Sequence, residues 1–599
     1  MSGDEPGAPI PVRPSSEVEF APPAPGEGEG LDRGPSTRWL AAIGLVVLVF
    51  VYLSRLGGFP LQDPDEGRYA EIPREMVELD DWVTPRLDYV RYFEKPPLLY
   101  WLTGACFQAF GQTEAAARLV PALSGIASVV ATWAIGRSML GARGGLLAAA
   151  MLATSPLFFV IAQFLLIDLL LVACMTAALG ALWGAHVSAR KESWAIAAAL
   201  ATALGVLAKG PVALVLVGAI ALSFLLASRD WAKLRSLLRT APLAAFVLVA
   251  VPWFVVVSLR NPEFPHAFFV REHFQRFTSD EVGHPEGPLF YLPILLGGPL
   301  PWTLLLVLAG LGERGRASFS AMRGDARLFC GLWAAIVVLF FSAARSKLPT
   351  YVLPAFPPLA LLGAAALDGA LDDRATRQRG LGWTASLLAG IGALLALAGL
   401  LALPLAGRIA ERIVRDPGEV RLVAISVLGC GLALAATGAW VRGGLGAGRT
   451  WASLVAGLSL GVGLALLSAI GAREVVHTGR ELARAIHRET RPGDRPLVAT
   501  YRKIIQSLSF YLPGRVVLVD TQEGFNEIGD QARETGERAT APHLWLGMDG
   551  LQSEWGSGRR AFVVTDARQA GELDVLRPTP RVLARHGKRV LLGNFPPGG

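Results

Sequence analysis

Residues 39–53 read WLAAIGLVVLVFVYL, and similar runs recur along the chain, as in AIAAALATALGVL at 195–207 and LLAGIGALLALAGLLAL at 387–403. A helix needs roughly 20 predominantly apolar residues to cross the hydrocarbon core of a bilayer, and these runs approach that length. They stop near residue 471. The pattern predicts a polytopic α-helical membrane domain followed by a segment outside the membrane.

The composition agrees with this prediction. Of the 599 residues, 52% are hydrophobic and 18% are charged, whereas soluble globular proteins carry about 25% charged residues. The net charge of +7 does not indicate a nucleic-acid partner, because Arg and Lys collect in the short segments between the apolar runs. In such segments they orient a membrane protein. The partners we expect in the membrane domain are lipids.

We count about thirteen spans, with boundaries uncertain by a few residues. If Arg38 marks the inside, every second loop should be basic, and the loops that follow from this choice are rich in Arg and Lys. This predicts a multi-pass protein with a cytoplasmic amino terminus and a carboxy terminus on the outer side of the membrane. The spans lie near 38–55, 115–136, 144–163, 168–187, 193–209, 211–227, 240–258, 289–311, 327–345, 350–370, 380–403, 420–440 and 451–471.

Three domains follow from these patterns. Residues 1–36 are rich in Pro, Gly, Glu and Ser and predict a disordered cytoplasmic tail. Residues 37–473 form the membrane domain, and residues 474–599 form a small extracytoplasmic α/β domain. Its predicted strands are 496–500, 516–520, 561–565 and 589–593, with helices in GRELARAIHRET and KIIQSLSFYL.

Unusual charged residues gather on the predicted outer face. The outer loop 56–114 contains DPDEGRYAEIPREM and DDWVTPRLDYVRYFEKPPLLYWL, in which Glu66–Leu79 has the spacing of an amphipathic helix at the membrane surface. A second long outer loop spans 259–288. Charges at membrane spans are costly and usually functional. The predicted outer face collects Asp63, Asp65, Glu66, Arg68, Glu94, Lys95, Asp168, Lys209, His273 and Lys347.

Each of these residues taken alone has a structural explanation. Asp168, in QFLLIDLLLVACM, is well placed to cap a helix, and Lys209, before the tight KGP turn, is well placed to reach toward the interface. His273, in REHFQRF, fits a surface histidine. The functional interpretation depends on the fact that all of these residues lie on the same predicted side of the membrane. Charged residues with unrelated structural roles would be found on both sides.

Carboxylates beside cations at a membrane surface suit glycosyl transfer from a lipid carrier. Arg and Lys recognise phosphate, and a carboxylate acts as a general base or stabilises positive charge at an anomeric carbon. A lipid-phosphate donor arriving through the membrane places its phosphate at this depth. No Walker-type loop and no strand-placed GxGxxG motif occurs in the sequence.

The first-loop sequence resembles the aminoarabinose transferases that modify lipid A, and more loosely the protein O-mannosyltransferases. Both are GT-C membrane glycosyltransferases. The resemblance extends to the acidic residue that opens the fourth span, to KGP and to REHFQRF. It also includes FYLPILLGGPLPW, SKLPTYVLP and the carboxy-terminal outer domain. It implies a GT-C fold in the bacterial inner membrane, with the carboxy-terminal domain in the periplasm. It also implies an enzyme, a pentosyl- or hexosyltransferase, that moves aminoarabinose from a polyprenyl-phosphate donor to lipid A, with inversion.

The resemblance also implies roles for individual residues. Asp65 is the principal catalytic carboxylate and Asp168 the second acidic residue. Arg68, Lys95 and Lys209 hold the donor phosphate, while Glu66, Tyr92, Lys347 and Tyr351 line the donor cavity. No cofactor is required on this interpretation; a divalent metal held by Glu94 and His273 is the alternative.

Other functions stay open at this point. The same fold could use another polyprenyl-linked sugar, such as mannose, with a protein or glycan acceptor. A transporter or lipid flippase predicts midplane charges and inverted repeats, and the sequence has neither pattern. A non-catalytic scaffold protein would not explain why Asp65, Lys95 and Asp168 lie on the same predicted face.

Overall fold

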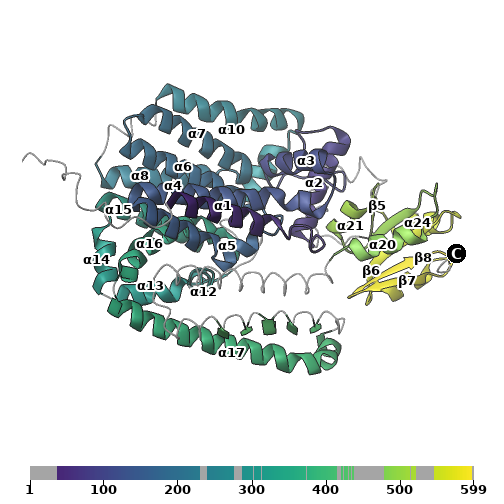
Figure 1. Ribbon diagram of the computed structural model, residues 1–599. Helices are drawn as coiled ribbons and strands as arrows, with labels where there is room; N and C mark the ends of the chain where they lie inside the picture. The colour runs from purple at the N-terminus through teal and green to yellow at the C-terminus, as the bar shows by residue number, and fades with distance from the viewer. Residues whose placement is uncertain are drawn as a thin grey trace, which may run out of the picture. The chain divides into compact units, whose positions relative to one another are not determined.

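A computed structural model gives the arrangement of the chain (Figure 1). It describes residues 37–229, 239–275, 286–413 except 301, 312 and 373, part of 420–436, and 478–595 except 513 and 521–544. The predicted tail 1–36, the predicted span 451–471 and the domain boundary at 473 lie outside these residues. The contacts below belong to Val46–Gly599, one of two compact units of the chain.

Long apolar helices build the membrane domain. They are α1 (Thr37–Leu53), α4 (Glu114–Ala153), α6 (Asp168–Val187), α7 (Lys191–Lys209), α8 (Val212–Ala227), α10 (Thr240–Arg260), α15 (Gly324–Ala343), α16 (Phe356–Asp372) and α17 (Arg374–Ile413). Among the described residues, seven segments are long and apolar enough to cross a membrane. Helix α6 packs against α4 and α7, and α16 packs against α4 (Figure 1). The chain is thus a multi-pass membrane protein, and the count of thirteen spans stays a prediction.

Two predicted spans are broken by proline-rich sequence. The predicted span 289–311 consists of α12 (Tyr291–Gly297) and α13 (Trp302–Leu311), with the sequence GPLP (298–301) between them. The predicted span 350–370 begins as a 3-10 helix, η2 (Pro349–Ala355), before α16. Proline lacks the amide that an α-helix needs, which explains both breaks. The shorter helices are α5 (Pro156–Ile161), the π-helix η1 (His266–Gln275) and α14 (Glu313–Ala321).

Helix α4 contains two arms that fold back on each other at Gly141. This residue has φ +81°, a conformation that glycine adopts at little cost. A Cβ atom on Gly136 would lie 2.8 Å from the Cα atom of Gly145, so the two arms are in backbone contact. The arms correspond to the predicted spans 115–136 and 144–163, although the second arm ends at Ala153 and the chain continues through α5.

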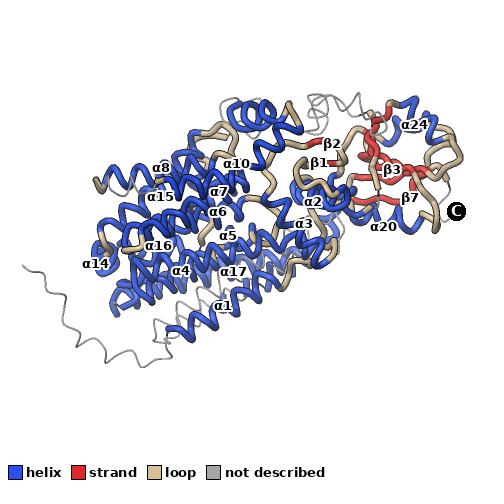
Figure 2. Tube along the Cα trace, turned by 90° about the horizontal axis from the view of Figure 1, so that it is seen from above, coloured by secondary structure: helices blue, strands red, loops and turns tan. Residues whose placement is uncertain are grey.

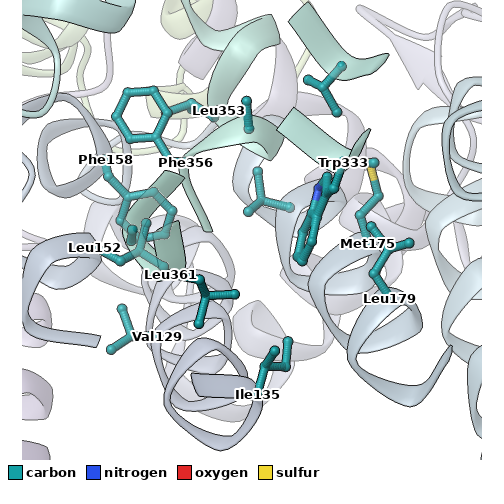
Figure 3. Packing of buried hydrophobic residues seen from close by; sticks show 14 of the residues in the cluster. Val129, Ile135, Leu152, Phe158, Met175, Leu179, Trp333, Leu353, Phe356 and Leu361 are labelled. Carbon is teal, nitrogen blue, oxygen red and sulfur yellow. The ribbon is translucent and has the colours of Figure 1, made fainter. Parts of the chain in front are cut away.

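The helices pack around an apolar core and expose further apolar side chains outward. Figure 3 shows part of this core, in which Trp333, Met175 and Leu361 come from different helices. On the outside, Leu248 of α10 is 73% exposed and Leu259 is 79% exposed. Outward apolar side chains on a long helix are typical of a surface that contacts lipid.

The first loop folds into compact structure beside the helices. It contains α2 (Asp65–Leu79), the antiparallel hairpin β1 (Arg86–Leu87) and β2 (Val90–Arg91), and α3 (Leu98–Phe110). Helix α2 is where the amphipathic spacing predicts it. However, every residue from Glu66 to Met76 is buried, including its charged ones. A helix with all faces buried must pair its charges inside the protein.

The C-terminal domain is a six-stranded sheet with helices (Figure 2). Its strands are β3 (Leu497–Tyr501), β4 (Val517–Val519), β5 (Trp545–Leu546), β6 (Ala561–Asp566), β7 (Arg581–His586) and β8 (Arg589–Gly593), in the order β5-β4-β3-β6-β8-β7. The first four are parallel, and β8 and β7 add an antiparallel edge. The remaining elements are α20 (Arg480–Glu489), α21 (Gln506–Tyr511), α24 (Met548–Trp555) and η5 (Ala570–Val575). The four predicted strands and two predicted helices are confirmed.

Candidate active site

Arg68 lies at the centre of a network of polar side chains. Its guanidinium donates hydrogen bonds to the Tyr92 hydroxyl at 2.8 Å and to Glu94 Oε2 at 2.9 Å, and it forms an ion pair with Asp65. Asp65 is the first residue of α2, so the two charges lie one helical turn apart on the same face. The α2 sequence thus places a carboxylate and a guanidinium together.

The segment after the β1–β2 hairpin completes this network. Glu94 accepts a hydrogen bond from Tyr92, and its Oε1 lies 2.8 Å from the Lys95 ammonium. The side chains of Arg68 and Glu94 are 7% and 5% exposed, whereas that of Asp65 is 48% exposed. We call Asp65, Arg68, Tyr92, Glu94 and Lys95 the Arg68 network; Asp65 is its most accessible carboxylate.

A second ion pair joins two membrane helices. Asp168 begins α6 and Lys209 ends α7, and the Lys209 ammonium lies 2.5 Å from Asp168 Oδ1. The same ammonium lies 4.4 Å from the centre of the Tyr351 ring, a cation–π contact. The N-cap of α6 is Ile167, so Asp168 is the first helical residue and does not occupy the cap position. Its partner is therefore Lys209, which is 11% exposed and does not extend into solvent.

One apolar cluster lies against both groups. It contains Tyr92 and Phe93 from the first loop, together with Ile167, Leu207 and Ala208, which precede Asp168 and Lys209 in the chain. The fold therefore forms two polar groups, the Arg68 network and the Asp168–Lys209 pair, and sequence neighbours of both belong to one apolar cluster. Tyr351 joins the second group through Lys209. That the two groups form one site stays a prediction.

In these groups the positive charges of the cations are neutralised by carboxylates. Each cation predicted to hold phosphate is paired: Arg68 with Asp65 and Glu94, Lys95 with Glu94, and Lys209 with Asp168. Pairing is expected, because an isolated charge is costly to bury. An incoming anion must therefore compete with carboxylates that are already in place.

Two predicted cavity residues are engaged elsewhere. Both oxygens of Glu66 lie 2.7 Å from the fully buried Arg118 guanidinium, and Glu66 also accepts from the amide of Leu165. The Lys347 ammonium donates to the carbonyls of Glu286 at 2.7 Å and Ala344 at 2.5 Å. These contacts give Glu66 and Lys347 a structural role. Their predicted position in a donor cavity stays a prediction.

The predicted metal ligands do not form a site in the described residues. Glu94 already bonds Arg68, Tyr92 and Lys95, and the side chain of His273 lies outside the described part of the chain. A carboxylate neutralised by two cations is a poor fit for a divalent metal. The metal pair stays a prediction, and no chemical step below depends on it.

A separate group of carboxylates lies further along α2. Ligand atoms of Glu71, Glu75 and Asp88 lie within 4.8 Å of one another, and all three residues are buried. Burial, and next the neighbouring Glu71, raise the pKa of Asp88 to about 7 and raise that of Glu75 well above its ordinary value. Arg74 pairs with Glu71 at 2.6 Å. We call Glu71, Glu75 and Asp88 the acidic cluster.

Our sequence predictions missed Arg118 and the acidic cluster. Arg118 is 0% exposed and lies in the predicted span 115–136, where a lone charge in an apolar run is itself a signal. The acidic cluster carries no such signal, because Glu71, Glu75 and Asp88 lie in a loop already rich in charges. Their contact depends on the β1–β2 hairpin folding against α2.

Comparisons with known sequences show which families the chain is similar to. The family described as dolichyl-phosphate-mannose-protein mannosyltransferase matches residues 40–268. A protein of Pectobacterium carotovorum subsp. carotovorum, named undecaprenyl phosphate-alpha-4-amino-4-deoxy-L-arabinose arabinosyl transferase, is 36% identical over 72% of this chain and 76% of its own length. A protein of Edwardsiella ictaluri with the same name is 36% identical over 59% of this chain, and the match spans 63% of that relative.

A comparison with solved structures gives the same fold. The crystal structure of ArnT from Cupriavidus metallidurans bound to undecaprenyl phosphate matches with a TM-score of 0.79 and 29% identity, over 94% of this chain and 99% of that one. The apo structure of that protein matches with a TM-score of 0.76. The match covers the C-terminal domain as well as the membrane domain, since it extends over nearly the whole chain.

Proposed function

The chain belongs to the family of undecaprenyl phosphate-aminoarabinose arabinosyl transferases, membrane glycosyltransferases of the GT-C fold, and on this premise we propose that it moves aminoarabinose from undecaprenyl phosphate to lipid A. The observation that carries the proposal is the pairing of cations with carboxylates in the Arg68 network and in the Asp168–Lys209 pair, whose sequence neighbours share one apolar cluster. Together they supply three cations for a phosphate and three carboxylates for the sugar end.

Donor binding on this proposal is an exchange of ion-pair partners. The carrier phosphate takes the place of a carboxylate on Arg68, Lys95 or Lys209, since phosphate is a strong acceptor for charged donors. Asp65 is the carboxylate best placed to leave, because it is half exposed while Glu94 is buried. Once released from Arg68, Asp65 lies one helical turn from the bound phosphate and faces the sugar.

The transfer step breaks one bond and forms another at the anomeric carbon. An acceptor oxygen attacks that carbon from the side opposite the carrier, the carbon–oxygen bond to the carrier phosphate breaks, and the configuration inverts. Arg68, Lys95 and Lys209 stabilise the negative charge that develops on undecaprenyl phosphate. Asp65 and Asp168 stabilise positive charge on the sugar ring.

The need for a base depends on the acceptor. A phosphate acceptor on lipid A already carries a nucleophilic oxygen, so Asp65 then acts mainly by electrostatics. A hydroxyl acceptor must lose a proton, and Asp65 then acts as the general base. No cofactor takes part in this scheme. The site faces the periplasm of the inner membrane on our proposed topology, where no nucleotide sugar competes.

Mass spectrometry of lipid A tests this function. A host that lacks its own aminoarabinose transferase but makes the lipid-linked sugar receives either the intact protein or Asp65→Asn. We expect lipid A to gain aminoarabinose with the intact protein and not with the variant. Asp80→Asn, an exposed carboxylate just after the same helix, is the matched control and should retain the modification.

The alternatives give different results in the same experiment. Unmodified lipid A with the protein folded in the membrane would reject this acceptor and direct the search to other glycans or to proteins, including mannosylated ones. Modification that persists in Asp65→Asn would reject Asp65 as the principal catalytic carboxylate. A lipid flippase would alter the sidedness of the donor without any change in lipid A.

A further inference from the structure

The start of α2 lies directly against the C-terminal domain. A Cβ atom on Gly67 would lie 2.4 Å from the backbone nitrogen of Ser507 and 2.8 Å from the carbonyl carbon of Gln506. No side chain fits in that space, so the close approach of α21 requires glycine between the acidic pair and Arg68. The helix that carries Asp65 is therefore in backbone contact with the C-terminal domain.

Asp63 ties the residues before α2 to the same domain. Its Oδ2 lies 3.0 Å from Nη1 of Arg589, and its Oδ1 accepts a hydrogen bond from the Ser507 amide at 2.7 Å. The side chains of Arg589 and Asp63 are 7% and 9% exposed, so the pair is shielded from water. Removing one partner of such a pair leaves an uncompensated buried charge, which forces the local structure to change.

The segment between Asp63 and Arg68 is short and internally bonded. The Gly67 amide donates to the Gln62 carbonyl at 3.1 Å, and the Arg68 amide donates to the Pro64 carbonyl at 3.1 Å. Asp65 lies inside this turn, two residues after Asp63. A shift of Asp63 is therefore transmitted to Asp65 by backbone that has little freedom of its own.

Arg589 occupies a special place in its sheet. It pairs with Asp566, the last residue of β6, so it lies at the carboxyl end of that strand. The strand order reverses between β3 and β6, and open α/β sheets bind ligands at the carboxyl ends of strands where this happens. Here Asp63 of the first loop reaches that position. Burial, and next the charge of Arg589, lower the pKa of Lys503, which lies two residues after β3.

Other contacts hold the domain without this pair. The Tyr511 hydroxyl accepts from the Leu61 amide at 2.8 Å and bonds Glu114 at 3.1 Å. Arg480 pairs with Glu114 at 3.2 Å, and Ser509 donates to Asp88. The loss of Arg589 should therefore leave the C-terminal domain docked and change only the residues around Asp63.

We infer that Arg589, acting through Asp63, is a positioning residue that fixes Asp65 in the active site. The inference rests on the proposed function in taking Asp65 as the catalytic carboxylate. It gives the C-terminal domain a direct part in transfer: the domain holds the first turn of α2 in the geometry that the Arg68 network requires. Arg589 touches neither substrate nor reacting atoms.

Hydrogen exchange and kinetics on the full-length protein in detergent test this inference together. The variants are Arg589→Gln, Asp63→Asn and Arg589→Lys, and the control is Arg585→Gln on β7, which is exposed. In Arg589→Gln we expect amides of residues 61–69 to lose about tenfold or more in protection, with β3 and β6 unchanged. Arg585→Gln should change none of these amides.

Transfer from undecaprenyl phosphate-aminoarabinose supplies the kinetic readout. We expect Arg589→Gln and Asp63→Asn each to lower kcat about 10- to 100-fold with a nearly unchanged donor KM, because misplacement by about 1 Å costs this much. The double variant should be no worse than either single one. Arg589→Lys keeps the charge and should recover most of the activity.

Each contrary outcome is decisive. Unchanged exchange at 61–69, or unchanged kcat in Arg589→Gln, would overturn the inference. Loss of protection throughout the C-terminal domain would overturn it too, by showing a general structural role. If the wild type transfers no sugar while exchange at 61–69 still responds to Arg589→Gln, the proposed function fails and the positioning of the α2 start stands.

Discussion

The first turn of α2 and the turns that follow it hold charged residues in opposite ways. In the first turn, Asp65 is half exposed and shares Arg68 with Glu94. Further along, Glu71 and Glu75 are fully buried and meet Asp88 in the acidic cluster. The first group balances charge by ion pairs. The second has more carboxylates than cations, and burial and the neighbouring Glu71 raise the pKa of Glu75 and of Asp88.

This difference distinguishes a site whose ion pairs can exchange partners with a ligand from a site whose role is structural. An ion pair with an accessible member can accept a new anion, as phosphate binding requires. A buried cluster of protonated carboxyl groups does not accept a new anion, because the anion would have to lose its hydration shell to enter. Such a cluster can instead hold neighbouring elements together. Asp88 bonds Ser509 of the C-terminal domain, so the acidic cluster joins α2, the hairpin and α21.

The largest expected effect is on transfer, through the first turn. Asp65→Asn keeps the shape of the side chain but removes its charge and basicity. We expect transfer to fall about 10²- to 10⁴-fold, the usual contribution of a general base. The measurement is kcat of the purified protein. Asp80→Asn is the control, and an equal loss in both variants would contradict a special role for the first turn.

The next effect is on stability, through the Glu66–Arg118 pair. Glu66→Gln leaves the fully buried Arg118 guanidinium without its carboxylate, and we expect a loss of roughly 3–5 kcal/mol in unfolding free energy. Thermal unfolding in detergent measures it. Glu192→Gln removes an exposed pair with Arg239 and should cost less than about 1 kcal/mol.

If Glu66→Gln unfolds like the wild type yet loses transfer, Glu66 belongs to the reaction site and not to its support. That result would return Glu66 to the donor cavity. It would also mean that the part of α2 whose ion pairs exchange with the donor includes Glu66.

A smaller effect is expected at the Asp168–Lys209 pair. Lys209→Met removes one of three phosphate-binding cations and leaves Asp168 unpaired, so kcat/KM for the donor should fall about 100-fold, near the value for a strong charged contact. Lys191→Met, at the exposed opposite end of α7, is the matched control. Equal activity in both variants would remove Lys209 from donor binding.

The smallest effect is a pH dependence of stability from the acidic cluster. Burial, and next Glu71, raise the pKa of Asp88 to about 7, so the folded protein holds a proton there that the unfolded chain releases near pH 4. Stability is then fully present at low pH and is lost as pH rises through about 7. Asp88→Asn removes this dependence.

Melting temperatures between pH 5 and pH 8 check that sign. We expect the melting temperature of Asp88→Asn to rise relative to that of the wild type as pH rises, by a few degrees. Asp80→Asn sets the baseline for an exposed carboxylate in the same loop. A difference that does not change between pH 5 and pH 8 would mean that Asp88 is ionised in the folded protein, as it is in the unfolded chain.

The sequence predicts elements whose pattern is local. Strand β8, Arg589–Gly593, was predicted with the bounds that the structure has, because the three apolar residues Val590, Leu591 and Leu592 follow one charge. Strand β5 has only two residues, and β7, Arg581–His586, lies at the sheet edge with charged and exposed residues. Neither shows the alternation that identifies a buried strand.

The site shows the same division between local and tertiary information. Asp65 and Arg68 were predicted from one motif, because their contact is a single helical turn. Sequence also singled out Asp168 and Lys209, but their contact across 41 residues is a product of the α6–α7 packing. The burial of the polar face of α2 could not be predicted, because it depends on α3 and on the C-terminal domain.

The affinity of Asp65→Asn for undecaprenyl phosphate tests the central claim most directly. If the donor phosphate replaces Asp65 on Arg68, the variant has no competing anion there. We expect it to bind undecaprenyl phosphate several-fold more tightly than the wild type by isothermal titration in detergent, although its transfer rate falls by about 10²-fold or more. A parallel loss of binding and transfer would contradict partner exchange and make Asp65 a part of the donor-binding surface.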